Sequence, residues 1–113
     1  MRTLYRSEAF NDFYASLEPN AQNKLDYALT ILSQMKVVST KFVKRIAGTD
    51  LYELRISVSN EYRVMIASLD HENIIESKEV ILLNGFMKKS SKDYKSQIET
   101  AHKLIELLSD DQD

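Results

Sequence analysis

The chain has 113 residues, which is enough for one domain and too few for two. Hydrophobic residues make up 43% and charged residues 28%, a globular mixture that excludes disordered, collagen-like and coiled-coil classes. The absence of cysteine excludes disulfides, thiolate zinc sites and thiol nucleophiles, and it favours a reducing compartment. A formal net charge of −2 argues against a surface that is basic throughout, while a local basic site stays possible.

Nothing in the sequence predicts export or membrane insertion. The N-terminal stretch MRTLYRSEAF lacks the apolar segment of a signal peptide. The apolar run at 80–83 is far shorter than the roughly 18 residues that span a bilayer. We therefore expect a cytoplasmic protein without a membrane partner.

Two helices are predicted at the start of the chain. Apolar side chains recur at helical spacing over 8–17, directly after Ser7, a residue type that caps helix N-termini. A second run of helical spacing follows Pro19, a residue favoured in the first turn of a helix, and extends to Met35. We expect the two helices to pack as a hairpin.

Strand patterns follow the helices. A weak signal over 42–47 precedes a turn at 48–50, and apolar and polar residues then alternate over 51–58 and over 62–69. The polar segment 70–78 predicts a loop. The apolar run at 80–83 predicts a central strand that is covered on both faces, and Gly85 should end or bulge it.

A third helix is predicted at the end of the chain. A capping-box pattern begins at Ser90, and apolar residues at helical spacing continue to Leu108. Residues 109–113 carry three aspartates and are expected to fray. The order of elements predicts a single α+β domain over 1–113, with two N-terminal helices, a small antiparallel sheet of three or four strands, and a C-terminal helix.

Burial selects the register of the hairpin between the two alternating strands. A three-residue loop over 58–60, with Asn60 in the left-handed region, sets Ile56 opposite Tyr62. Every pair on that face is then apolar. A slip of one residue would move core side chains into water, so this register is the one we expect.

The same register places Arg55 opposite Arg63 on the other face. Like charges directly opposite one another on a sheet destabilise it by up to about 1 kcal/mol, so a neutralising group is expected. Glu53 on the same face is one candidate. A bound phosphate is the other, because guanidinium groups bind phosphate oxygens in a bidentate manner. The spacing alone leaves both open.

Further positive charge comes from other segments. Lys88 and Lys89 follow the predicted central strand, and the segment 36–45 carries four basic residues and no acidic one. A solvated charge run is the ordinary explanation for either segment alone. The coincidence of Arg55, Arg63 and the pair 88–89 at sheet positions, in a chain of negative net charge, favours an anionic ligand instead.

Other kinds of site find no support. His71 and His102 have no second ligand at a metal-binding spacing, so no metal site is expected. With only Gly48 and Gly85, the chain has no glycine-rich phosphate loop. We therefore expect no nucleotide or other small-molecule cofactor.

Three short motifs occur in order along the chain: LYELR at 51–55, YRV at 62–64 and FMKK at 86–89. Together with the order helix, helix, sheet, helix, they resemble the RelE/HigB toxin superfamily, and most nearly its phage-derived HigB-like branch. The resemblance extends over residues 7–108 and implies a RelE-like fold. It also implies the toxin of a type II toxin–antitoxin system, which a cognate antitoxin protein neutralises.

Most members of that superfamily cleave messenger RNA on the ribosome without a metal. The resemblance thus implies an mRNA interferase in which a 2′-hydroxyl attacks the adjacent phosphate. Arg55 and Arg63 would stabilise the developing charge, and Lys88 or Lys89 would assist proton transfer. The residues expected to contact RNA are Lys41, Lys44, Arg45, Lys92, Lys95 and Tyr94.

A binding protein on the same fold is the alternative. It would be either a ParE-like inhibitor that acts on a topoisomerase by contact, or a degenerate relative that only binds its antitoxin. Cleavage needs the arginine pair and the two lysines, whereas a contact inhibitor does not. Replacing Arg63 by alanine is expected to abolish cleavage with little loss of folding, because its side chain is predicted to point away from the apolar pairs.

Overall fold

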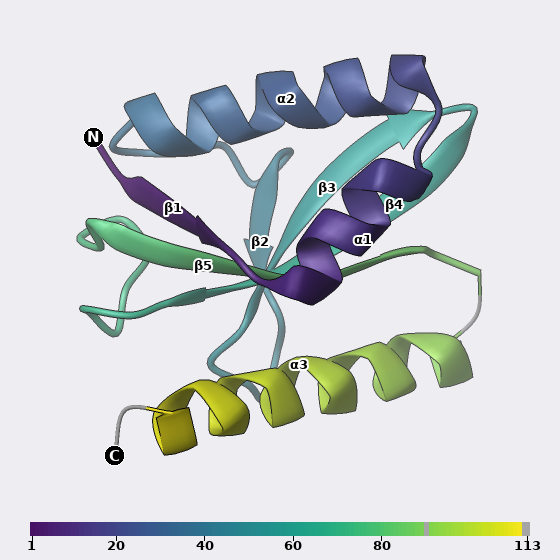
Figure 1. Ribbon diagram of the computed structural model, residues 1–113. Helices are drawn as coiled ribbons and strands as arrows, with labels where there is room; N and C mark the ends of the chain where they lie inside the picture. The colour runs from purple at the N-terminus through teal and green to yellow at the C-terminus, as the bar shows by residue number, and fades with distance from the viewer. Residues whose placement is uncertain (90, 112–113) are drawn as a thin grey trace.

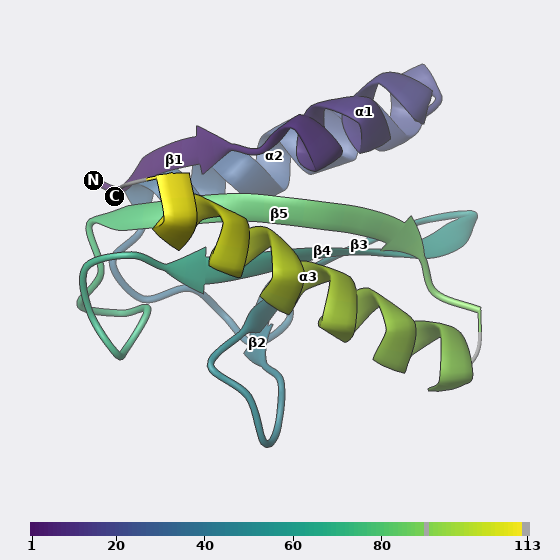
Figure 2. The ribbon, with the colours of Figure 1, turned by 60° about the horizontal axis from the view of Figure 1, so that its bottom comes forward.

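The structure is a computed structural model that describes residues 1–89 and 91–111, and it confirms the α+β class. Two helices, α1 (Glu8–Ser16) and α2 (Pro19–Gln34), lie on one face of a sheet, and α3 (Ser91–Asp111) lies on the other (Figure 1). Figure 2 shows the same three layers from a second direction. The strands are β1 (Thr3–Arg6), β2 (Val43–Arg45), β3 (Tyr52–Val58), β4 (Asn60–Ser68) and β5 (Glu79–Met87).

Both N-terminal helices begin where the sequence predicts them. The Ser7 hydroxyl accepts a hydrogen bond from the Phe10 amide at 3.1 Å and so caps α1. Pro19 occupies the first position of α2, where the missing N–H costs nothing. The buried stripe of α2, which includes Leu25 and Leu32, packs with Phe10 against the sheet to form the first core.

The sheet has one strand more than predicted and is mixed. Its order is β1-β5-β4-β3-β2, and β1 pairs parallel with β5, while the other neighbours are antiparallel. The β1 strand has only four residues, of which three are exposed and Leu4 is half-buried. Such a strand carries no alternation that a sequence pattern can detect.

The predicted register of the β3–β4 hairpin is confirmed. Ile56 pairs with Tyr62, and Arg55 pairs with Arg63. The loop differs from the prediction, because the left-handed residue is Ser59, with φ of 62°, and not Asn60. Asn60 already pairs with Val58 inside the ladder, so the single residue at the tip makes the reversal.

The fifth strand continues through Gly85 to Met87, and its pairing with β4 shifts between Val64 and Ile66. Glycine is required here by close packing. A Cβ on Gly85 would lie 2.2 Å from Cδ2 of Phe13 on α1. Beyond this contact, the buried run of β5 is covered on both faces, as predicted.

A second core lies between the sheet and α3. Ala101 of α3 is fully buried there, among Met65, Leu83 and Phe86 of the sheet. The predicted capping box involves residue 90, which lies outside the described residues. The predicted frayed tail coincides in part with α3, which extends to Asp111, and residues 112 and 113 are not described. Within the described ranges, no helix has both the length and the apolar character needed to cross a membrane.

Candidate functional site

The two facing arginines differ in burial. Arg63 is only 3% exposed, whereas the side chain of Arg55 is 33% exposed. Arg63 points away from the first core, as predicted, but the second core and α3 cover that face of the sheet. Its Nη1 donates a hydrogen bond to the carbonyl oxygen of Tyr62 at 2.9 Å. The expectation that Arg63→Ala folds with little loss is therefore revised, since the substitution empties a packed position.

Glu53 supplies the negative charge between the arginines. Its side chain lies on the same face, and the residue is only 6% exposed. Oε1 lies 3.4 Å from Nε of Arg55 and 3.8 Å from Nε of Arg63. The second distance suits an ion pair but exceeds a hydrogen bond, and the buried Nε of Arg63 has no hydrogen-bond partner in the structure. Of the two neutralising groups considered from the sequence, the internal carboxylate is present.

Tyr94 connects this charge cluster to α3. Its hydroxyl donates a hydrogen bond to Oε2 of Glu53, and its ring meets Phe86 edge-on, with centroids 5.9 Å apart. Burial raises the pKa of Tyr94 well above its usual value, and the hydrogen bond to Glu53 raises it further. The ammonium of Lys88 lies 5.7 Å from the centroid of the same ring.

Glu61 adds a second, exposed carboxylate. Its Oε1 lies 3.5 Å from Nη2 of Arg63. A hydrogen bond from Ser57 lowers the pKa of Glu61, and the positive charge of Arg63 lowers it further. The backbone amide of Lys88 donates a hydrogen bond to the carbonyl oxygen of Glu61 at 2.8 Å. The backbones of Glu61 and Lys88 are therefore adjacent.

A cleft of about 390 Å³ opens where β3 extends beyond the short strand β2. Four basic side chains line it, against one carboxylate. The lining residues are Lys24, Tyr27, Lys41, Phe42, Arg55, Ile56, Ser57, Glu61 and Arg63. The structure thus brings Lys41, predicted to contact RNA, together with both arginines.

The other residues predicted to contact RNA are not among those that line the cleft. Lys44 lies opposite Glu53 in the β2–β3 ladder, so its exposed side chain is on the sheet face that carries the arginine pair. Arg45 pairs with Tyr52 on the opposite face and lines a different hollow, so the structure does not bring it to the arginine pair. The remaining predicted lysines, Lys89, Lys92 and Lys95, are exposed.

Sequence reasoning missed Glu61 and the α2 side of the cleft. Lys24 and Tyr27 belong to a helix whose spacing identified only its buried stripe. The two residues are three positions apart, which puts both on one exposed face of the helix. An aromatic residue beside a lysine on that face was the sequence signal for this side of the cleft. Among the described residues, no group of three or more histidine, aspartate and glutamate side chains is arranged to hold a metal ion.

Comparisons with known proteins agree with the fold. A model of the family described as "Phage derived protein Gp49-like" matches residues 12–106. The intact RelBE toxin–antitoxin complex of E. coli contains a chain with a TM-score of 0.61 and 15% identity, covering 80% of this chain and 100% of that one. A mutant of E. coli toxin RelE in the free state gives a TM-score of 0.65 and 18% identity, covering 92% and 97%. No curated protein matches the chain.

Proposed function

The chain belongs to the Gp49-like family of phage-derived proteins, and on that premise we propose that it is the toxin of a type II toxin–antitoxin system that cleaves messenger RNA. The observation that carries the proposal is the arginine pair at a basic cleft. Arg55 and Arg63 face one another across β3 and β4 beside a cleft lined by four basic side chains, and the exposed part of Arg55 can bind phosphate oxygens. The RelE-like fold supports the same function.

The proposed reaction is an internal transfer at one phosphate of the RNA chain. The 2′-hydroxyl oxygen attacks the adjacent phosphorus, and the bond from phosphorus to the 5′-oxygen breaks. The products are a 2′,3′-cyclic phosphate and a free 5′-hydroxyl. Arg55 binds the phosphate from the rim of the cleft. Glu53 contacts the Nε atom of Arg55, so the two terminal nitrogens of the Arg55 guanidinium stay available for phosphate oxygens.

Two protons must move in this reaction. Glu61 is the one carboxylate that lines the cleft, so it is the group proposed to accept the proton of the 2′-hydroxyl. Lys88 can donate a proton to the departing 5′-oxygen. Lys88 is proposed to approach from the α3 side, where its ammonium lies 5.7 Å from the centroid of the Tyr94 ring, whereas Glu61 acts from the cleft. Lys89, one residue further, is the second lysine that the family resemblance implies.

The partners follow from the proposed function. One similar solved structure is itself a toxin–antitoxin complex, which supports a cognate antitoxin as the neutralising partner. Messenger RNA on the ribosome is the proposed substrate, which places the action of the protein in the cytoplasm. The exposed residues Lys44, Lys92 and Lys95 are proposed to contact RNA outside the cleft.

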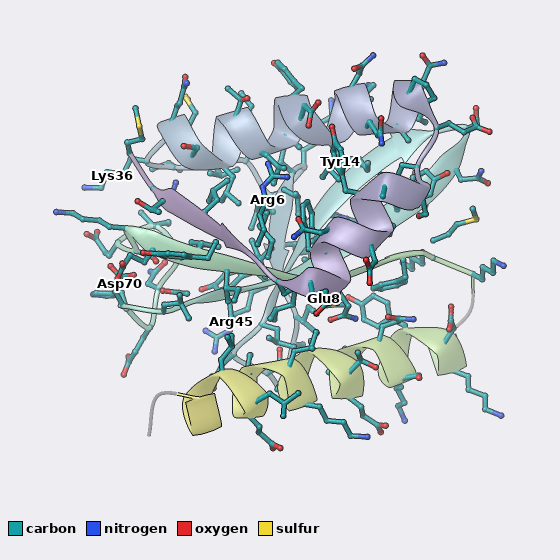
Figure 3. All side chains as sticks on the ribbon, viewed as in Figure 1. Arg6, Glu8, Tyr14, Lys36, Arg45 and Asp70 are labelled. Atoms are coloured by element: carbon teal, nitrogen blue, oxygen red, sulfur yellow. The ribbon has the colours of Figure 1, made fainter. Side chains whose placement is uncertain are left out.

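The test is induction of the protein in bacteria, followed by mapping of new 5′ ends on messenger RNA. Arg55→Ala is the informative variant, because the partial exposure of Arg55 makes its loss tolerable for folding. Arg6→Ala is the matched control, because Arg6 is an exposed arginine on β1, at the far side of the sheet. Figure 3 shows Arg6 beside Tyr14, and its guanidinium lies 6.0 Å from the centroid of that ring.

New 5′ ends within translated regions, present with Arg6→Ala and absent with Arg55→Ala, would support the proposal. Growth arrest with intact messages would contradict it and favour a topoisomerase-type inhibitor. Absence of any arrest would indicate a relative that only binds its antitoxin.

A further inference from the structure

We infer that the α2 side of the cleft binds a nucleobase next to the cleaved phosphate, with the Tyr27 ring as the stacking surface and the tilted Phe42 ring supporting it. The inference rests on the proposed function, and it specifies how the RNA chain continues beyond the arginine pair. Lys24 and Lys41, which flank the two rings in the cleft, would contact the neighbouring phosphates.

The two rings form an open aromatic surface. Tyr27 is 59% exposed, although it is a large side chain on a helix with a well-buried stripe. Its ring centroid lies 6.2 Å from that of the half-buried Phe42, with 59° between the ring planes. Most of the Tyr27 side chain is therefore outside the core, so packing within the protein does not explain why an aromatic residue stands there. Exposed aromatic rings beside positive charge are the usual surface on which single-stranded nucleic acids stack their bases.

The backbone fixes this surface beside the arginine pair. The amide of Arg55 donates a hydrogen bond to the carbonyl oxygen of Phe42 at 2.7 Å. Phe42 directly precedes β2, so it stands at the point where β3 loses its neighbour and the cleft begins. A base stacked on Tyr27, beside Phe42, and a phosphate on Arg55 would thus occupy one continuous cleft.

Charge and volume favour one nucleotide of an RNA strand. The cleft is lined by Lys24, Lys41, Arg55 and Arg63 against the single carboxylate of Glu61, in a chain whose net charge is −2. A local excess of positive charge in a cleft attracts a polyanion even when the whole protein is acidic. A volume of about 390 Å³ lies at the low end of pockets for small organic ligands, which span roughly 300–1,000 Å³.

The test is a double-mutant cycle that combines removal of one RNA base with removal of the Tyr27 ring and measures whether their effects on cleavage depend on one another. Messenger RNA is prepared intact or with an abasic nucleotide on either side of the cleavage position, and single-turnover cleavage is measured with and without ribosomes at subsaturating protein. The wild type should slow about tenfold when one particular flanking base is missing. Tyr27→Ala should be slow by a similar factor on intact RNA and should lose nothing further on the abasic RNA.

Three further variants separate stacking from other effects. Tyr27→Phe keeps the ring and should keep the sensitivity to the missing base, whereas Tyr27→Leu keeps apolar bulk and should lose it. Tyr5→Ala removes another exposed tyrosine, on β1, and should behave as the wild type. The midpoint of thermal unfolding, measured for each variant, checks that the fold is intact.

Equal slowing of the wild type and Tyr27→Ala on abasic RNA would overturn the inference, because the ring and the base would then act independently. Unchanged cleavage by Tyr27→Ala, with loss of neutralisation by the antitoxin, would assign the rings to a protein partner and also overturn it. If the wild type cleaves no RNA under either condition, the proposed function itself fails, and the base site falls with it.

Discussion

Replacing Glu53 by glutamine keeps the size of the side chain but removes the negative charge between Arg55 and Arg63. Removing one partner of a fully buried ion pair costs about 3–5 kcal/mol. Arg55 is one-third exposed, and glutamine still offers Tyr94 an oxygen acceptor, so a smaller effect is expected here. We expect Glu53→Gln to lower the free energy of unfolding by about 2 kcal/mol, part of which is repulsion between the two arginines.

The assay is urea and thermal unfolding at neutral pH. For a domain of this size, the expected loss lowers the melting temperature by roughly 8–12 °C. Glu61→Gln is the matched control, because Glu61 also contacts Arg63, at 3.5 Å, but its side chain is 52% exposed. Water screens that contact, so the control should unfold close to the wild type.

A double variant identifies the cause of the loss. Adding Arg55→Met to Glu53→Gln removes one of the two facing charges and should restore part of the lost stability. If Glu53→Gln unfolds with the wild type, or if Arg55→Met brings no recovery, then Glu53 does not neutralise the arginine pair and the reasoning is refuted.

Three other substitutions test separate contacts. Tyr94→Phe removes the hydrogen bond to Glu53. The pKa of Tyr94 is higher in the folded protein than in the unfolded chain, so its neutral hydroxyl stabilises the fold below about pH 10, and this stabilisation is lost as the pH rises further. The difference in thermal stability between the wild type and Tyr94→Phe should therefore shrink above about pH 10. Asp70, in the loop that follows β4 (Figure 3), accepts hydrogen bonds from Ser77 and from the amide of Lys78, which lower its pKa to about 2. This stabilisation is present above about pH 4 and is lost as the pH falls towards 2, so Asp70→Asn should melt below the wild type at pH 7 and close to it at pH 2. Gly85→Ala should cost about 1–3 kcal/mol in urea unfolding by overpacking against Phe13, and Phe13→Leu in the same chain should recover part of that cost; a single variant as stable as the wild type would contradict the contact.

Local periodicity was sufficient for most of the fold. The helices at 8–17 and 19–35 and the two alternating strands lie within two residues of their predicted bounds. The register of the hairpin also followed, because only one register sets Ile56 and Tyr62 opposite one another on the core face, and with it came the facing arginines. Each of these features depends on residues close together in sequence.

Features that depend on distant segments did not follow from the sequence. The β1 strand is defined by its pairing with β5, more than seventy residues away, and not by its own pattern. The hydrogen bond between Tyr94 and Glu53 depends on how α3 lies over the sheet, which no spacing within α3 encodes. For the same reason, the cleft itself was not predicted: Arg55, Arg63 and Lys41 were identified as residues, and the α2 side that completes the cleft was not.

Burial gives the two arginines different roles. Arg63 lines the cleft but is only 3% exposed and is enclosed by the sheet and α3, so its loss would disturb packing as well as the proposed chemistry. Arg55 stands at the rim, where a phosphate can displace water without opening the core. Glu53 permits this arrangement because it stabilises the pair in the absence of RNA while contacting Arg55 at Nε. Under the proposed function, the site is thus held ready in the free protein, and Arg55→Ala tests phosphate binding with less disturbance of the core than Arg63→Ala.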